Sequence, residues 1–489
     1  MESYKSLLNY LKNIEFQNYV VAMLRWEMDT TAPKKSFNYL IEVSTKYEME
    51  SFKYTTDEKF INLINDVIND KEYDNLDICE KTYIQKLKED YYKQKNIPED
   101  FYKDYCELRN KSLNAWVEAK QKGDYSIFKP YLVDIIEETK KLYTFMYPNS
   151  KNLYDCMLND YETGLKSEQI DQLFNELKEE IIPIIRQLKS LKFGKLKNTC
   201  TNEELIDLGK YLLSYIGFDN ERGALGIYTH GYTMKLNNND VRITFSNDND
   251  ITDICSTLIH EGGHGIFEQC IDGKLKDIYT YDIDKIALHE SQSRFFENIL
   301  GRNINFWKPI YEDVKEKIHI DMPIENFMQQ FNNARPSLIR TEADELTYCM
   351  HIIIRYEIER MIFNGDVNYD ELPYIWNKKY KEYLGIEVDN DRNGILQDMH
   401  WSEGAFGYFP SYLLGSIFDG MLLETINEKV GNVDEILAQG KIKNITKFLN
   451  ENIHKFGGTY NISETAKRVC GKELEVKGIV KYFKEKYCN

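Results

Sequence analysis

"TLIHEGGHGIFEQ", residues 257–269, combines two histidines, two glutamates and three glycines in one helical segment. On such a helix His260 and His264 lie one turn apart, opposite the apolar residues, and Glu261 projects between the two sides. This HExxH pattern allows two imidazoles to bind one zinc ion, with a carboxylate beside the bound water. Each helical glycine costs roughly 1 kcal/mol relative to alanine. We therefore expect metal binding to offset that cost, and the small residues to let a second helix or a substrate come close.

The segment 282–300, "DIDKIALHESQSRFFENIL", supplies a third metal ligand. Its apolar stripe consists of Ile283, Ile286 and Ala287. Glu290 is the next member of that stripe, and a buried carboxylate is costly unless it is paired or bound to a metal. A salt bridge to Arg294 is the alternative for Glu290, and His289 competes with it as a ligand. Two histidines and a glutamate leave a fourth position for water, which favours metal-assisted hydrolysis of an amide.

The composition is that of an ordinary folded protein and argues against several classes of partner. The chain has 489 residues, of which 42% are hydrophobic and 29% charged, and a formal net charge of -18. That charge argues against nucleic-acid and anionic-membrane binding. The sequence has no apparent secretory signal and no apolar run of ~18 residues. Nine scattered cysteines then predict a cytoplasmic protein with free, mostly buried thiols that have no catalytic role.

Helical patterns fill most of the chain. Residues 1 to about 190 read as successive helices, with Ser167 as an N-cap and a capping box from Thr201 to Glu204. Glycines interrupt this pattern at about 217–250, and "VRITFS", residues 241–246, alternates as a strand with one buried face. We expect a mostly α fold with a small β element beside the active site. One catalytic domain would span 1–489, with an N-terminal helical part at about 1–200 and a metal-site core at about 217–420.

Several further motifs, in this order along the chain, resemble those of the thermostable carboxypeptidase Taq family of zinc metallocarboxypeptidases. They are "LRWEMDTTAP" (24–33), "DVRIT" (240–244), HExxH, "HESQ" (289–292), "LIRTEADELTY" (338–348), "ILQDMHW" (395–401) and "GAFGYFPSY" (404–412). The sequence departs from the family at "HGYT" (230–233), where an HPF motif is usual. A looser loop and altered substrate preference could follow from this change.

The resemblance implies a fold and an activity. The fold would be an elongated helical molecule with a deep central cleft, similar to neurolysin and angiotensin-converting enzyme. The enzyme would be a homodimer that binds Zn²⁺, with Co²⁺ or another divalent ion as alternatives. It would remove single residues from peptides with a free C-terminus, with broad specificity. An endo-oligopeptidase or dipeptidase, or a catalytically silent helical scaffold, is the competing interpretation.

The catalytic roles follow from the motifs. His260, His264 and Glu290 would hold zinc, and Glu261 would activate water and then protonate the leaving amine. His400 and Tyr408 would donate hydrogen bonds to the oxyanion; their alternative is a structural aromatic turn.

The substrate-binding roles leave more alternatives open. Arg340 would bind the substrate carboxylate, unless it pairs with Glu342, Asp344 or Glu345. The other candidates for substrate contact are His230, Arg242 and Tyr412. Arg242 could instead brace the cleft floor. His351 and Trp401 are interpreted as core residues.

Overall fold

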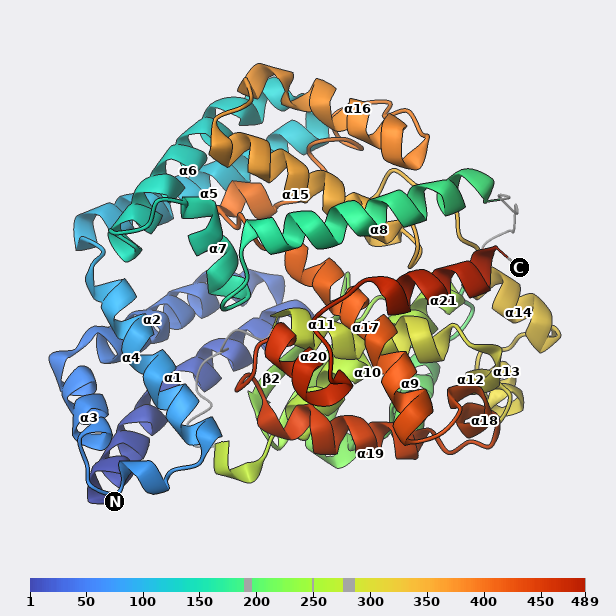
Figure 1. Cartoon of the computed structure of the whole chain (residues 1–489), viewed down its shortest axis with the longest axis horizontal. Helices are drawn as coiled ribbons and strands as arrows, with labels where there is room; N and C mark the ends of the chain where they lie inside the picture. Colours follow the sequence, from blue (N-terminus) through green and yellow to red (C-terminus); the bar gives the residue numbers. More distant parts are fainter. Residues whose placement is uncertain (189–195, 249, 276–285, 489) are drawn as a thin grey trace.

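Helices dominate the computed structural model, which describes residues 1–188, 196–248, 250–275 and 286–488 (Figure 1). The first group is α1 (Glu2–Thr30), α2 (Phe37–Thr56), α3 (Glu58–Ile68), α4 (Ile78–Lys95), α5 (Glu99–Lys122), α6 (Tyr125–Met146), α7 (Leu153–Tyr161) and α8 (Ser167–Gln187). The second is α9 (Asn202–Ile216), α10 (Ile251–Gln269), α11 (Ile286–Arg294), α12 (Ile304–Trp307), α13 (Tyr311–Lys317), α14 (Ile324–Phe331), α15 (Tyr348–Asn364), α16 (Leu372–Leu384), α17 (Phe409–Lys429), α18 (Val433–Ala438), α19 (Ile442–Asn452), α20 (Ile462–Cys470) and α21 (Lys477–Tyr487). The predicted mostly α fold is confirmed.

Two of these helices test the predicted caps. Thr201 and Glu204 form the expected capping box at the start of α9, with the Thr201 backbone N–H 2.7 Å from a Glu204 carboxylate oxygen. The prediction for α8 was wrong by one residue, because Lys166 takes the N-cap position and Ser167 is already helical. The backbone N–H of Ser167 donates instead to Asp155, at 2.9 Å.

A three-stranded sheet forms the predicted small β element. Its strands are β1 (Gly223–Ile227), β2 (Tyr232–Asn237) and β3 (Asp240–Phe245), in the order β1–β3–β2. β3 pairs in parallel with β1 and antiparallel with β2. Val241, Ile243 and Phe245 are completely buried, which confirms the buried face expected from their alternation.

α10 and α11 lie near the centre of the molecule beside α17 (Figure 1). The predicted apolar face of α10 is buried throughout; it consists of Ile251, Ile254, Cys255, Leu258 and Ile259. α10 also packs against the sheet, since a Cβ added at Gly265 would lie 3.2 Å from the Ile243 Cδ1. Ile286 begins α11, whereas Ile283 of the same predicted stripe lies outside the described residues.

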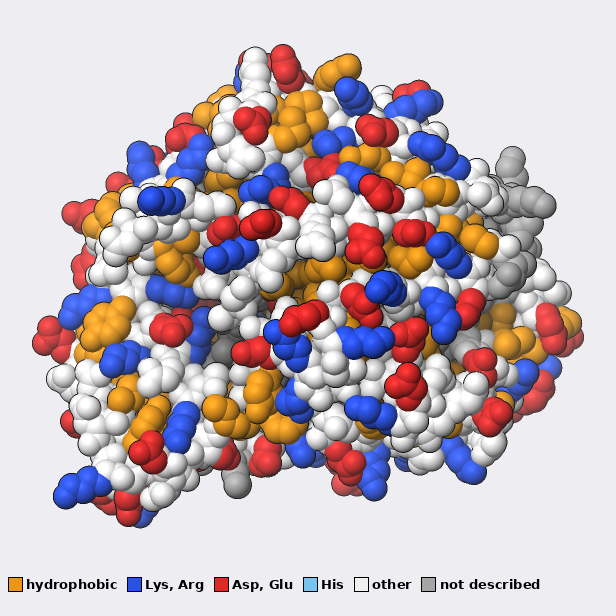
Figure 2. All heavy atoms as spheres, viewed as in Figure 1, with side chains coloured by type: hydrophobic (Ala, Val, Ile, Leu, Met, Phe, Trp, Pro, Cys, Tyr) orange, Lys and Arg blue, Asp and Glu red, His pale blue; other side chains and the backbone are white. Residues whose placement is uncertain are grey.

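The buried apolar residues form two clusters. The larger extends from Tyr83 to Phe483 and includes the central helices and the sheet. The smaller, which we call the N-terminal cluster, joins α1, α3 and α4; it consists of Leu7, Tyr10, Leu11, Ile14, Phe60, Ile61, Ile64, Val67, Ile84, Leu87 and Tyr91. The face seen in Figure 2 is hollowed between the N-terminal helices at its left and the central helices. The division into N-terminal part and metal-site core within one domain stays a prediction.

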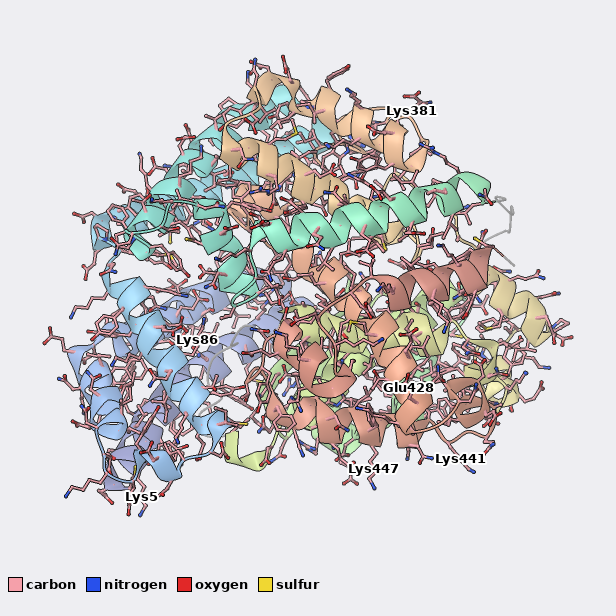
Figure 3. The ribbon with its side chains drawn as sticks, viewed as in Figure 1. Lys5, Lys86, Lys381, Glu428, Lys441 and Lys447 are labelled. Atoms are coloured by element: carbon pink, nitrogen blue, oxygen red, sulfur yellow. The ribbon has the colours of Figure 1, made fainter. Side chains whose placement is uncertain are left out.

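Charged side chains of both signs are interspersed over the visible face (Figure 2), and Lys5, Lys381 and Lys447 project outward in Figure 3. Among the described helices, none combines the length and apolar composition that crossing a membrane requires. The nine cysteines are free thiols, as expected. The expectation that most are buried was wrong, since only Cys156, Cys255 and Cys349 are. Cys79, Cys106 and Cys470 lie on partly exposed helix faces, and Cys200, Cys270 and Cys488 lie just outside helix ends.

Candidate metal centre

The first two metal-ligand candidates lie on α10. The rings of His260 and His264 are 5.0 Å apart between centroids, as expected for imidazoles one turn apart on the same side of a helix. Both side chains are partly buried, with exposed fractions of 20% and 13%, so they can face a ligand while the rest of the helix is held in the core.

Glu290 of α11 completes the group. Its Oε2 lies 3.5 Å from the Nε2 of His264 and 4.0 Å from the Nε2 of His260. The three candidate donor atoms all lie within 4.8 Å of one another. Ligands about 2.0–2.1 Å from a tetrahedral zinc ion are separated by roughly 3.3 Å. The donor set and its spacing therefore fit one divalent cation after small side-chain adjustments.

Further charged groups orient these ligands. The Nδ1 of His260 lies 2.8 Å from Glu297, which leaves Nε2 directed toward Glu290. Glu297 also accepts a hydrogen bond from Ser256, at 2.8 Å. Arg294 donates to the other oxygen of Glu290, at 2.7 Å. The salt bridge to Arg294, the alternative considered for Glu290, is thus present, but it uses Oε1 and leaves Oε2 available to a metal.

The pKa values report the electrostatics of this group. Burial alone would raise the pKa of Glu297. Its hydrogen bond to His260 outweighs that effect and lowers the pKa to about 2. Burial lowers the pKa of His260, and the Glu297, Glu290 and Glu261 carboxylates together raise it to about 9. Burial raises the pKa of Glu290, whereas Arg294 and the two imidazoles lower it well below its usual range. The carboxylates of Glu290 and Glu297 therefore favour a positive charge at this centre, and a bound divalent cation would supply it.

His289, the competing ligand, lies outside this group. Its Nε2 is 3.0 Å from Glu268, and its ring stacks on His264 at 4.3 Å. The structure therefore brings Glu290 to the two histidines of α10 and gives His289 a different carboxylate partner.

Glu261, the predicted general base, is held by the sheet. It is 6% exposed, and the Thr233 hydroxyl oxygen lies 2.7 Å from its Oε2 and 2.9 Å from its backbone carbonyl oxygen, so one hydroxyl hydrogen serves these two acceptors. Gly231 packs closely beside it, because a Cβ there would lie 2.4 Å from Thr257 Cγ2 and 3.2 Å from Glu261 Oε1. The glycine of "HGYT" thus permits a close approach to α10.

The glycines of α10 have the same explanation. A Cβ at Gly263 would lie 2.7 Å from the carbonyl oxygen of Gln292 and from the Cα of Ser293, so the backbones of α10 and α11 are in contact. A Cβ at Gly262 would lie 2.6 Å from the side-chain ends of Leu213 and Ile216 in α9. The expectation that the small residues let a second helix come close is confirmed.

His400 and Tyr408 lie on a second segment beside the centre. Their rings are 5.4 Å apart, and the Tyr408 ring is 5.1 Å from that of Tyr161. Burial raises the pKa of Tyr408, and the nearby Glu290 carboxylate contributes to the rise. Burial also lowers the pKa of His400 to about 4, so its imidazole is neutral at pH 7.

A buried carboxylate, Glu359, holds this segment in place. It is fully buried and accepts hydrogen bonds from the Trp401 indole at 2.7 Å, the Gly407 backbone at 2.8 Å and the Tyr154 hydroxyl at 2.8 Å. Trp401 and His351 are buried, as interpreted from the sequence. Because Trp401 and Gly407 lie at opposite ends of one turn region, Glu359 fixes the segment that carries His400 and Tyr408.

Arg340 takes a partner that the sequence did not indicate. Its guanidinium donates to Asp398 at 2.9 and 3.0 Å and to the Tyr348 hydroxyl at 3.0 Å. Arg355 pairs with the other oxygen of Asp398, at 2.6 Å. Two guanidinium groups therefore share one carboxylate, and Arg340 also lies 5.4 Å from the ring of Tyr412.

The two remaining candidates lie on and beside the sheet. Arg242 pairs with Asp240 through two contacts of 2.9 Å and stacks on Trp26 of α1 at 5.3 Å, which favours the bracing role. His230 is exposed in the loop between β1 and β2, with its Nδ1 3.1 Å from the Thr229 hydroxyl.

Sequence reasoning missed Glu297, Thr233, Glu359 and Asp398. A signal existed only for Glu297, which follows Glu290 by seven residues and so repeats on the same helix face. The other three act through partners far away along the chain.

The chain is similar to known proteins over nearly its whole length. A family model described as Carboxypeptidase Taq (M32) metallopeptidase matches residues 6–487. Carboxypeptidase 1 of Bacillus subtilis is 37% identical over 495 residues, covering 99% of this chain and 98% of that protein. Thermostable carboxypeptidase 1 of Thermus thermophilus is 27% identical over 503 residues, again covering 99% and 98%. A structure of Pyrococcus furiosus carboxypeptidase matches with a TM-score of 0.93 at 28% identity, covering 100% of this chain and 99% of the other.

Proposed function

The chain belongs to the carboxypeptidase Taq (M32) metallopeptidase family and is a carboxypeptidase, and we propose that it uses zinc to release single residues, with broad specificity, from peptides with a free C-terminus. The observation that carries this proposal is the approach of Glu290 to both His260 and His264, with Glu261 on the same helix. A zinc ion held by these three ligands would polarise the scissile carbonyl and lower the pKa of water.

Glu261 moves the proton. Its carboxylate accepts a proton from the attacking water and returns it to the leaving amine. The Thr233 hydroxyl donates a hydrogen bond to Oε2 at 2.7 Å and so orients the carboxylate. The other oxygen, Oε1, is then the one that contacts the attacking water. Thr233 is therefore a positioning residue in this mechanism.

His400 and Tyr408 stabilise the oxyanion. The neutral imidazole and the protonated phenol each carry one hydrogen that can be donated to negative charge developing on the carbonyl oxygen. The buried Nδ1 of His400 has no hydrogen-bond partner among the described residues, which supports a role for this ring in binding substrate.

Arg340 binds the substrate carboxylate. Asp398 neutralises only one of the two guanidinium groups it contacts, so a net positive charge remains beside Tyr412. A guanidinium is suited to two-point recognition of a carboxylate. Tyr412 and the exposed His230 contact the peptide, and Arg242 braces the strand beneath it.

The resemblance supports a dimer, the acidic charge argues against nucleic-acid and membrane binding, and the free cysteines favour a cytoplasmic location. We infer that the enzyme is a cytoplasmic homodimer and that it binds neither nucleic acid nor membranes. Light scattering of the purified protein over a range of concentrations tests the dimer, and a monomer at every concentration would contradict it.

The test of the proposed function uses one peptide in two forms, with a free and with an amidated C-terminus. Mass spectrometry should show successive loss of single C-terminal residues from the free form only, and elemental analysis should find zinc rather than cobalt or another ion. Glu261→Gln should abolish the reaction, whereas the exposed Glu428→Gln control should retain it. Equal cleavage of both peptides would contradict the exopeptidase assignment, and an active Glu261→Gln variant would contradict the mechanism.

A further inference from the structure

A second group of metal-ligating side chains lies outside the metal centre. Cys200 lies two residues before α9, Glu204 in its first turn, and His319 in the turn that follows α13. Their candidate donor atoms, a sulfur, a carboxylate oxygen and an imidazole nitrogen, all lie within 4.8 Å of one another. This group shares no residue with His260, His264 and Glu290.

The turn after α13 contacts both Glu204 and Cys200. The Nε2 of His319 lies 2.9 Å from Glu204 Oε1, and the sulfur of Cys200 lies 3.6 Å from the Lys317 carbonyl oxygen. His319 has a φ of 55°, and it is the one non-glycine residue with positive φ in the described part of the chain. Few residues other than glycine adopt this left-handed conformation, although histidine does so more often than most, and here it places the imidazole beside Glu204.

The local structural roles of these residues do not require all three donors. Glu204 caps α9 through Oε2, which accepts from the Thr201 backbone, and its Oε1 is directed to His319. A partly exposed ion pair contributes only about 0–1 kcal/mol, and it has no need of a sulfur beside it. The His319 and Glu204 side chains are 50% and 41% exposed, which leaves a path for an ion and room for a water as fourth ligand.

We propose that Cys200, Glu204 and His319 form a second divalent-metal site, which takes a zinc-type ion. One thiolate, one imidazole and one carboxylate are ligands that zinc and cobalt accept, whereas magnesium and calcium prefer oxygen alone. The thiolate and the carboxylate together balance the charge of a divalent ion. The thiol proton is released to solvent when the ion binds.

The site also has a structural consequence. α9 packs through Leu213 and Ile216 directly against Gly262 of the helix that carries His260 and His264. An ion held at the start of α9 ties this supporting helix to the turn after α13. Occupancy of the second site therefore stabilises the helix on which α10 rests.

Cobalt titration tests the proposal without any measurement of peptidase activity. The metal centre offers no sulfur, so a thiolate-to-cobalt charge-transfer band reports on the second site alone. Metal-stripped wild-type protein should bind two cobalt ions per chain and develop the band. Cys200→Ala should bind one ion and lack the band, whereas Cys470→Ala, which removes another half-buried thiol, should behave as wild type.

His319→Gln is the second variant. Its side chain is 50% exposed, so little packing is lost, and its fold is checked directly because the position has a φ of 55°. It should keep the first ion and weaken binding of the second by about tenfold or more. Circular dichroism of each variant confirms that the fold is intact. A wild type without the band, a band that persists in Cys200→Ala, or His319→Gln that binds both ions as wild type does would each overturn the proposal.

Discussion

Gly263→Ala should damage both folding and metal binding, because the α10 and α11 backbones touch at this position. The added Cβ would lie 2.7 Å from the Gln292 carbonyl oxygen and 2.7 Å from the Ser293 Cα. These are backbone atoms, which cannot rotate away, so α11 must move as a unit. Glu290 precedes Gln292 by two residues and would move with it.

The size of the effect follows from two opposing terms. Overpacking costs about 1–3 kcal/mol, and contact with backbone places Gly263→Ala near the upper end. Alanine is about 1 kcal/mol more favourable than glycine in a helix, so the net loss in the free energy of unfolding is about 2 kcal/mol. Gly262→Ala is the matched control, since its Cβ meets only the side-chain ends of Leu213 and Ile216, and its two terms should nearly cancel.

Two assays separate the consequences. Urea denaturation with a chelator present measures folding alone, and Gly263→Ala should lose about 2 kcal/mol relative to Gly262→Ala. Competition with a chromophoric chelator measures zinc affinity, which should be weaker in Gly263→Ala because Glu290 is displaced. Each 1.4 kcal/mol of destabilisation of the zinc-bound state corresponds to about a tenfold loss of affinity. If both variants match in stability and in zinc affinity, the backbone contact does not position the ligand, and the reasoning is refuted.

Three other substitutions test the groups around the centre. Glu297→Gln removes the charged partner of His260 and should weaken zinc binding about 10–100-fold in the chelator competition, and an unchanged affinity would contradict this role. Thr233→Val should lower kcat with little change in KM because Glu261 loses its orienting hydroxyl, and Thr233→Ser should restore it; equal kcat in all three proteins would rule the positioning role out. Glu359→Gln removes a carboxyl whose pKa burial raises to about 7. The folded state then binds this proton more tightly than the unfolded chain, where glutamate titrates near about 4.3, so this contribution is present below about pH 4.3 and is lost as the pH rises through about 7. Urea midpoints should therefore fall more for wild type than for Glu359→Gln between about pH 5 and about pH 8, and parallel curves would contradict the shift.

The ligand group was predictable because its determinants are local. A four-residue spacing on one helix fixes the relation of His260 to His264, and an apolar stripe that continues into a carboxylate indicates Glu290. The glycines were also interpretable, since small residues on a buried helix allow close packing. The structure brings these predicted elements together as expected.

The partners of Arg340 were not predictable from neighbouring residues. Glu342, Asp344 and Glu345 have suitable spacing, but Arg340–Glu342 forms a short 3-10 turn rather than an α-helix. Asp344 instead accepts from Thr347, and Glu345 contacts Lys486 and Tyr487 near the C-terminus.

Asp398 and Glu359 meet their partners through tertiary packing. The contact between Arg340 and Asp398 spans 58 residues of sequence, and that between Tyr154 and Glu359 spans 205. No periodic pattern encodes such a pair, because each depends on how whole helices pack.

The N-terminal cluster is the smaller of the two apolar clusters, and Tyr4 and Leu8 of α1 pack against both. α1, α3 and α4 hold one another through their own apolar residues, whereas the metal-binding helices belong to the larger core. The end of α1 meets the sheet through polar and aromatic contacts, with Asp29 and Trp26 against Tyr232. Such an arrangement favours sub-global opening, in which the first helices detach at a lower free energy than complete unfolding. Amide hydrogen exchange should then be faster in α1 and α3 than in α10 and α11.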